Sequence, residues 1–129
     1  MIGEGSPPRS AGGRDMLKVV FLNVNGLRCE SKRKEVLEMV RKGRMDVVGL
    51  QETHMKGCGV GGNDCELWEG MEGGVVWCGV DEKSKGRGRE GCALLMSPRV
   101  WESTEVHGWK GSRIVWAVGK IGIVKYAWM

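Results

Sequence analysis

Two short apolar runs, joined by a charged amphipathic segment, constrain the fold of this chain more than any other feature of its sequence. Residues 17–22 (LKVVFL) and 46–50 (DVVGL) are brief and rich in β-branched side chains, a pattern typical of buried strands. The connection between them is long enough for a crossover through a helix, so we expect the two strands to run parallel in one sheet. The sequence therefore predicts a strand–helix–strand unit.

The segment between these strands has the pattern of a helix. Val36, Leu37 and Val40 form one apolar stripe, and lysine and glutamate residues occupy the opposite face. Ser31 is a favourable N-cap residue and Gly43 a favourable terminator. The helix is therefore predicted to begin at Ser31, as its cap, and to end just before Gly43.

Polar side chains follow each predicted strand at the point where it ends. Asn23 and Asn25 follow the first strand, and Glu52 follows the second. Because parallel strands end at the same edge of a sheet, where open α/β sheets bind ligands, we expect these three side chains to converge. The alternative is that the two asparagines are turn formers and Glu52 is a solvated strand end.

The second half of the chain consists of short apolar runs separated by Gly, Ser or Pro, a pattern that favours an antiparallel meander. A parallel unit followed by a meander predicts an α+β fold or a layered sandwich. The Gly-rich stretch after Thr53 is predicted as a loop. The expected strands are 75–80, 92–96, 100–106, 113–118 and 121–128.

The amino-acid composition is typical of a globular domain. Hydrophobic residues make up 41% and charged residues 28% of the 129 residues, which favours a globular domain over a disordered chain. Residues 1–15 lack an apolar cluster and are predicted to be a disordered arm. No apolar run approaches the ~18 residues of a membrane span, so no membrane partner is expected. The five cysteines include no C-x-x-C pair, which favours reduced thiols and a nuclear or cytoplasmic location.

Two motifs carry a resemblance to a known family. Residues 22–27 (LNVNGL), followed after a helix by residues 50–54 (LQETH), resemble the endonuclease/exonuclease/phosphatase superfamily, and residues 91–97 (GCALLMS) resemble a later strand of that family. The residues at 113–115 look like the strand after it. Within the superfamily, the sequence is most similar to endonucleases of LINE-type retrotransposons and to the related craniofacial-development-protein-like branch.

The resemblance implies a four-layer α/β sandwich with two mixed sheets, of which this chain would supply the N-terminal half. Residues 16–129 are accordingly predicted to be a partial domain of this family. The final run, residues 121–129 (IGIVKYAWM), is apolar to its end, so we expect the chain to be a fragment of a longer domain.

The resemblance also implies a Mg²⁺-dependent phosphodiesterase that nicks DNA. Glu52 matches the metal-binding glutamate, and Asn23 matches the asparagine that hydrogen-bonds near the phosphate; both are carried over as catalytic residues. Asn25, where related AP endonucleases usually have Asp, is assigned to the metal site with Glu52. Gln51 is predicted to orient the metal ligands. His54 is predicted to contact a DNA phosphate.

A basic segment, residues 83–89 (KSKGRGR), is a further candidate for DNA contact. Within it, Arg87 and Arg89 are predicted to bind phosphates. The alternative is that this segment is a solvated hairpin tip.

The family's later motifs, Tyr-x-Pro-Asn, Asp-x-Asn, Gly-Asp-x-Asn and Ser-Asp-His, are not found in this sequence. They supply the base and the His–Asp pair of the reaction, so we expect the chain alone to be inactive. Three alternatives stay open: a non-catalytic nucleic-acid-binding or interaction protein, a phosphatase or lipid phosphodiesterase of the same superfamily, and a product that does not fold stably.

Overall fold

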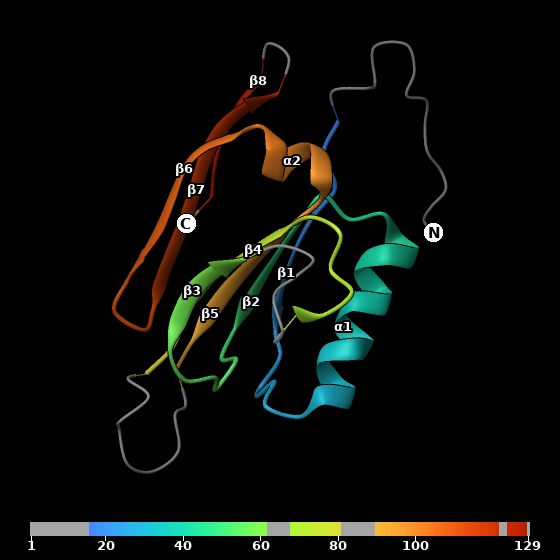
Figure 1. Ribbon diagram of the computed structural model, residues 1–129. Helices are drawn as coiled ribbons and strands as arrows, with labels where there is room; N and C mark the ends of the chain where they lie inside the picture. The colour runs from blue at the N-terminus through green and yellow to red at the C-terminus, as the bar shows by residue number, and fades with distance from the viewer. Residues whose placement is uncertain (1–15, 62–67, 81–89, 122–123, 129) are drawn as a thin grey trace.

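The computed structural model describes residues 16–61, 68–80, 90–121 and 124–128 (Figure 1). Within these ranges the chain forms eight strands and two helices. In chain order they are β1 (Val19–Asn23), α1 (Glu30–Gly43), β2 (Val47–Gln51), β3 (Cys58–Gly61), β4 (Gly74–Cys78), β5 (Cys92–Met96), α2 (Pro98–Glu102), β6 (Thr104–Lys110), β7 (Ile114–Ile121) and β8 (Val124–Trp128).

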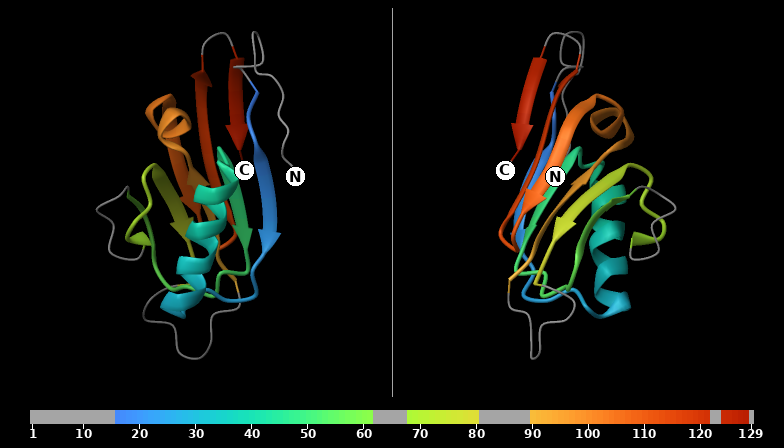
Figure 2. Two further views of the ribbon diagram at one scale, coloured as in Figure 1. Left: turned by 90° about the vertical axis from the view of Figure 1, so that its right-hand side faces the viewer. Right: turned by 60° about the vertical axis from the view of Figure 1, so that its left-hand side comes forward.

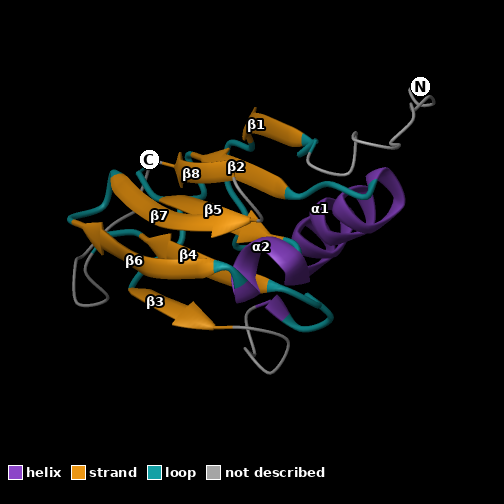
Figure 3. Cartoon of the chain, turned by 90° about the horizontal axis from the view of Figure 1, so that it is seen from above, coloured by secondary structure: helices purple, strands orange, loops and turns teal. Residues whose placement is uncertain are grey.

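The strands form two sheets that pack as layers. The first sheet has the order β1-β2-β5-β4-β3 and the second the order β6-β7-β8. Strands β1 and β2 are parallel, as expected, and all other pairs are antiparallel. Helix α1 covers one face of the first sheet and the second sheet covers the other (Figures 2 and 3). The described residues therefore form part of an α/β sandwich.

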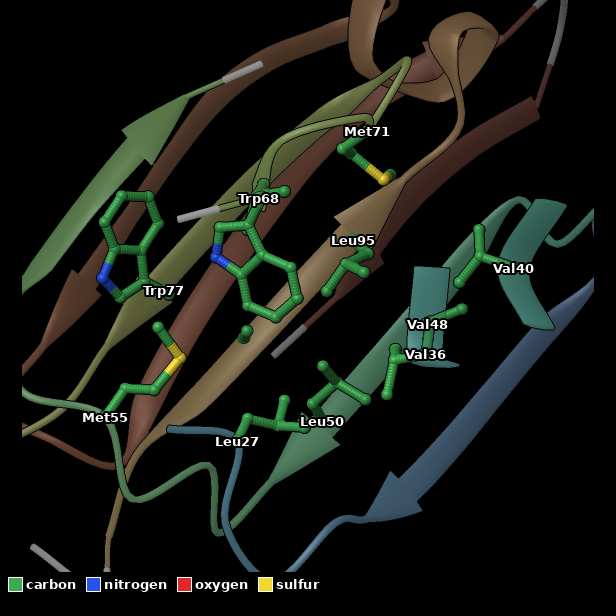
Figure 4. Close-up of a cluster of buried hydrophobic side chains, with 12 residues drawn as sticks. Leu27, Val36, Val40, Val48, Leu50, Met55, Trp68, Met71, Trp77 and Leu95 are labelled. Carbon is green, nitrogen blue, oxygen red and sulfur yellow. The ribbon is translucent and has the colours of Figure 1, made fainter. Parts of the chain in front are cut away.

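The buried strands divide their side chains between two hydrophobic clusters. Because alternate residues of a strand point to opposite faces, Val48 and Leu50 pack toward α1, whereas Val47 packs toward the second sheet. Val36 and Val40 of the predicted helical stripe complete the first cluster (Figure 4). Burial on both faces explains why residues 47–50 of β2 are all apolar, whereas the last residue, Gln51, is polar and exposed.

The ends of α1 differ from the prediction. The helix begins at Glu30, one residue before Ser31, and the N-cap residue is Cys29, which makes no side-chain capping bond. The helix includes Gly43 as its last residue, and its C-cap residue is Arg44, which adopts the left-handed conformation with φ 51°. The backbone N–H of Met45 donates to the carbonyl of Val40 (3.0 Å), so a Schellman-type end closes the helix without glycine.

The predicted antiparallel meander is divided between the two sheets. Strands β3, β4 and β5 form one meander within the first sheet, and β6, β7 and β8 form a second. The segment expected as one strand at 121–128 is divided between β7 and β8, whose register pairs Ile121 with Val124. The Gly-rich stretch expected as a loop contains β3.

The strand predicted at 100–106 begins later than expected. Residues 98–102 are helix α2, because Pro98 fits the first helical turn and the N–H of Trp101 donates to the carbonyl of Ser97 (2.8 Å). The strand starts only at Thr104.

An ionic cluster around the buried Asp46 fixes the start of β2. The Asp46 carboxylate accepts hydrogen bonds from the Arg99 guanidinium (3.0 and 3.1 Å), the Ser97 hydroxyl (3.0 Å) and the backbone N–H of Lys18 (3.0 Å). These donors come from the segment before β1 and from the start of α2. The cluster therefore ties three segments together at the sheet end away from Asn23 and Gln51.

The β1 side of the first sheet is less covered than its centre. Phe21 is 57% exposed although it lies in the middle of a strand. Its ring lies over Gly49 of β2, where a Cβ would come within 2.4 Å of the ring. Glycine at this position therefore makes room for the aromatic side chain.

Candidate functional site

The loops that follow β1 and β2 continue the pairing of the two parallel strands. The backbone N–H of Val24 donates to the carbonyl of Gln51 (3.0 Å), and that of Gly26 donates to the carbonyl of Glu52 (2.7 Å). Leu27, which is fully buried, continues this ladder with a bond from its N–H to the carbonyl of Thr53 (2.7 Å). These bonds hold the two loops side by side.

The loop after β2 is also tied to the residues before β5. The N–H of Thr53 donates to the carbonyl of Gly91 (3.2 Å), and the N–H of His54 donates to the carbonyl of Glu90 (3.0 Å). The Arg28 guanidinium in turn donates to the carbonyl of His54 (2.7 Å). Glu52 therefore lies in a loop whose backbone is held from both sides.

The side chains of Asn23 and Glu52 meet at this edge of the sheet. The amide nitrogen of Asn23 donates to Oε2 of Glu52, and its carbonyl oxygen accepts the backbone N–H of Asn25 (3.2 Å). The Asn25 bond fixes which end of the Asn23 amide faces the carboxylate. All three residues are exposed, so the carboxylate is open to solvent and to ligands.

Three residues of the two loops have left-handed backbone conformations. The φ angles are 47° at Asn25, 55° at Glu52 and 59° at His54. Such a conformation costs an ordinary L-residue about 1–2 kcal/mol, and asparagine less. The bonds described above compensate for this cost. Strain of this kind, at an exposed carboxylate, is characteristic of functional sites.

The His54 ring packs on the loop after β1. A Cβ on Gly26 would lie 3.1 Å from Nδ1 of His54, and Gly26 has φ 105°, so glycine is required there on two grounds. The ring is half-buried and lies next to the residues that precede Arg28. His54 thus belongs to the same edge of the sheet as Glu52.

The remaining predicted site residues are Gln51, Arg87 and Arg89. Gln51 is exposed and lies opposite Asn23 in the register of the parallel strands. Its main-chain carbonyl takes part in the ladder, whereas the side-chain bond to Glu52 comes from Asn23. Arg87 and Arg89 lie outside the described residues.

A charged cluster beside the site has no counterpart among the predictions from the sequence. The Arg113 guanidinium donates to the Glu90 carboxylate (Nε to Oε2, 2.9 Å), and the Ser112 hydroxyl contacts the same carboxylate. Arg113 and Ser112 lower the pKa of Glu90, and Glu90 raises the pKa of Arg113. Nothing in the sequence relates residues so far apart, because the cluster depends on the packing of one sheet on the other.

A cavity of about 570 Å³ opens at the opposite end of the first sheet. Its walls include Arg41 of α1, Met71 and Ser97, and Asp46 of the ionic cluster also lines it. Neither Asn23 nor Glu52 borders this cavity. The candidate site, where Asn23 and Glu52 are exposed, is therefore separate from this cavity.

A family model for the endonuclease/exonuclease/phosphatase family matches residues 20–125. The chain belongs to this family. The match includes both loops of the candidate site and all the strands that carry them. No curated protein matches the chain in a sequence search.

Members of the endonuclease/exonuclease/phosphatase family generally use divalent metal ions. The described residues include no group of three or more His, Cys, Asp or Glu side chains that would form a complete metal cage. The donors at the edge are one carboxylate, of Glu52, and the amide oxygens of asparagine. Such hard oxygen donors in an open site fit Mg²⁺, which keeps several of its waters.

No described helix is both long and apolar enough to cross a membrane.

Proposed function

We propose that this chain is a Mg²⁺-dependent DNA phosphodiesterase unit of the retrotransposon endonuclease type, with Glu52 as the metal ligand. The contact between Asn23 and Glu52 carries the proposal, since it joins the two motifs of the family resemblance at one edge of the sheet. Family membership supports hydrolysis of a phosphate ester but not the choice among DNA, a phosphomonoester and a lipid.

In this proposal the residues of the site have separate tasks. Glu52 holds the ion through its carboxylate, and Asn23 orients that carboxylate by hydrogen-bonding one of its oxygens. Asn25 offers an amide oxygen to the metal site, and Gln51 supports the ligands from the end of β2. Bound Mg²⁺ would neutralise negative charge on the phosphate as the phosphodiester bond breaks.

Binding of DNA would use the groups around this edge. His54 contacts a phosphate, and Arg87 and Arg89 supply positive charge from the basic segment. The sequence lacks a His–Asp pair like that of the family's later motifs. Because general acid–base groups contribute about 10²–10⁴-fold to a rate, we propose that these 129 residues alone bind metal and DNA but cleave very slowly.

Metal binding is tested with Mn²⁺ as a spectroscopic probe. The electron paramagnetic resonance signal of free Mn²⁺ is followed as the full chain is added, and Mg²⁺ is then used as competitor. We expect Glu52→Gln to weaken Mn²⁺ binding at least tenfold while keeping the fold, because glutamine can still accept the bond from Asn23. The exposed Glu102 of α2 provides the control, Glu102→Gln. Equal affinities of Glu52→Gln and the unaltered chain would refute the proposal.

Cleavage is tested with supercoiled plasmid and Mg²⁺. We expect little nicking by the 129-residue chain. Robust nicking that disappears in Glu52→Ala would contradict the low activity but would support the metal role of Glu52. Preferential hydrolysis of a phosphomonoester such as p-nitrophenyl phosphate would instead favour a phosphatase.

The concentration of basic residues in the segment Lys83–Arg89 favours a second candidate, a non-catalytic DNA-binding protein. Binding of duplex DNA that is the same with Mg²⁺ and with a chelator would support this second function over the first. Charge reversal at Arg87 and Arg89 would then reduce both the affinity and its salt dependence.

A further inference from the structure

A pair of thiols lies between the two sheets, in register on neighbouring strands. Cys78, the last residue of β4, is directly opposite Cys92, the first residue of β5. Their sulfur atoms are 3.4 Å apart. Residues directly opposite in an antiparallel pair have Cα atoms about 4.5–5.5 Å apart, which lies within the range that a disulfide spans.

We propose that Cys78 and Cys92 form a redox-active dithiol, a modification site that hydrogen peroxide converts reversibly into an intramolecular disulfide. The proposal is independent of the metal and DNA functions of the edge at Glu52. It depends on the register of β4 and β5 and on the contact between the two sulfur atoms.

The hydrogen bond between the thiols separates their acidities. The bond from Cys92 lowers the pKa of Cys78 to about 7, although burial acts in the opposite direction. The same bond, together with burial, raises the pKa of Cys92. Thiolates are the form that oxidants attack, and this bond favours a thiolate at Cys78 beside a thiol at Cys92. Because Cys78 is buried and Cys92 is partly exposed, peroxide has to reach the pair from the Cys92 side.

The oxidation needs one peroxide molecule for each pair. The Cys78 thiolate attacks one peroxide oxygen, the O–O bond breaks, and hydroxide leaves and takes up a proton, so that Cys78 becomes a sulfenic acid. The Cys92 sulfur then attacks the Cys78 sulfur, and the sulfenic hydroxyl leaves with the Cys92 proton as water. Two thiols thus lose two electrons to the peroxide, giving one disulfide and two waters.

A third cysteine is placed to form a competing disulfide with Cys78. Cys58 of β3 is directly opposite Cys78 on its other side and is exposed. However, the sulfur contact in the structure joins Cys78 to Cys92. The Cys78–Cys92 pair is therefore expected to close first.

A disulfide between β4 and β5 would lie close to the candidate site. Cys92 is opposite Gln51 on the side of β2, and the preceding residue, Gly91, accepts the backbone bond from Thr53. The disulfide would join β4 and β5 next to this bond. We therefore expect it to stabilise this end of the sheet against opening.

The test uses the full chain, reduced and then exposed to hydrogen peroxide under native conditions. Peptide mass spectrometry without reduction should show a cross-linked Cys78–Cys92 peptide that is two hydrogens lighter than the separate thiol peptides. Dithiothreitol should reverse it. Oxidation should raise the melting temperature by about 5–15 °C.

Variants separate this pair from the other thiols. Cys29→Ser and Cys58→Ser remove exposed cysteines outside the pair and should leave the cross-link and the melting shift intact. Cys92→Ser should abolish both. A dominant Cys58–Cys78 cross-link, or conversion of Cys78 or Cys92 to sulfinic acid without cross-linking in the unaltered chain, would overturn the proposal, and so would two thiols that peroxide leaves unchanged.

Discussion

The amide nitrogen of Asn23 donates a hydrogen bond to the carboxylate of Glu52, which lies 29 positions further along the chain. The two residues come together because β1 and β2 are parallel and end at the same edge of the sheet. The backbone of Glu52 is held in a left-handed conformation by bonds to both neighbouring segments. The carboxylate is therefore oriented by the protein itself.

Asn23→Ala should weaken Mn²⁺ binding by about 3–10-fold without abolishing it. The substitution removes the donor that orients Glu52 but leaves the carboxylate, and a hydrogen bond to a charged group contributes about 1.5–3 kcal/mol at most. The electron paramagnetic resonance titration measures this change. A loss as large as that of Glu52→Gln would mean that Asn23 is itself a principal ligand.

Gly91→Ala should destabilise the protein by about 3 kcal/mol and weaken Mn²⁺ binding. Gly91 has φ 118°, and an added Cβ would lie 2.4 Å from the Thr53 hydroxyl, so the substitution combines backbone strain with a clash against the loop of Glu52. The matched control is Gly111→Ala. Gly111 also has positive φ (62°), but no atom lies within 4 Å of its added Cβ, so about 1 kcal/mol should be lost and metal binding should be unchanged. Urea unfolding and the Mn²⁺ titration give both readouts.

Asp46→Ala should lower the free energy of unfolding by about 2 kcal/mol. It removes the buried acceptor of the ionic cluster and leaves the donors of Lys18, Ser97 and Arg99 without this partner. Glu38 pairs with Arg41 and Lys42 on the exposed face of α1, and Glu38→Ala should have a much smaller effect. Similar urea midpoints for the two variants would show that the cluster contributes little.

Arg44→Gly should stabilise the protein by about 1 kcal/mol. Arg44 ends α1 with φ 51°, a conformation that glycine adopts without the Cβ penalty. Arg41→Gly, in the last turn of the same helix, should destabilise by about 1 kcal/mol, since glycine is a poor helix former. Chemical denaturation should therefore shift the two variants in opposite directions.

The stability of the reduced protein should rise as the pH increases from about 7 to about 9. The pKa of Cys78 is lowered to about 7 from its usual value of 9.0, so over this range the folded chain has released a proton that the unfolded chain retains. Above pH 9 the trend should reverse, because the raised pKa of Cys92 keeps its proton on the folded chain only. Cys78→Ser should remove the rise, which urea unfolding at several pH values would detect.

The strand–helix–strand unit could be predicted from the sequence because its signals are local. The runs before Asn23 and before Gln51 are apolar, and the helical stripe at Val36 and Val40 has the period of an amphipathic helix. The proximity of Asn23 and Glu52 could be predicted because both residues follow strands that run parallel and end at the same edge of the sheet. Helix ends were less predictable, since Arg44 takes the left-handed conformation that usually indicates glycine.

Features that depend on distant segments could not be predicted. Helix α2 occupies the first residues of the segment predicted as a strand at 100–106, and its Val100 is buried in the hydrophobic cluster between the two sheets. The left-handed conformation of Glu52 has no signal in the sequence, because glutamate has no preference for it. The contact of Cys78 with Cys92 requires the register of two strands, which their spacing along the chain does not give.

Strand β1 is also the outer strand of its sheet, with β2 as its one neighbour among the described strands. Its outward backbone groups lie next to the largely uncovered ring of Phe21. An edge strand with an exposed aromatic side chain is a surface on which an extended segment of another chain can pair. Self-association at high protein concentration should consequently start from β1, at the same strand that delivers Asn23 to the metal site.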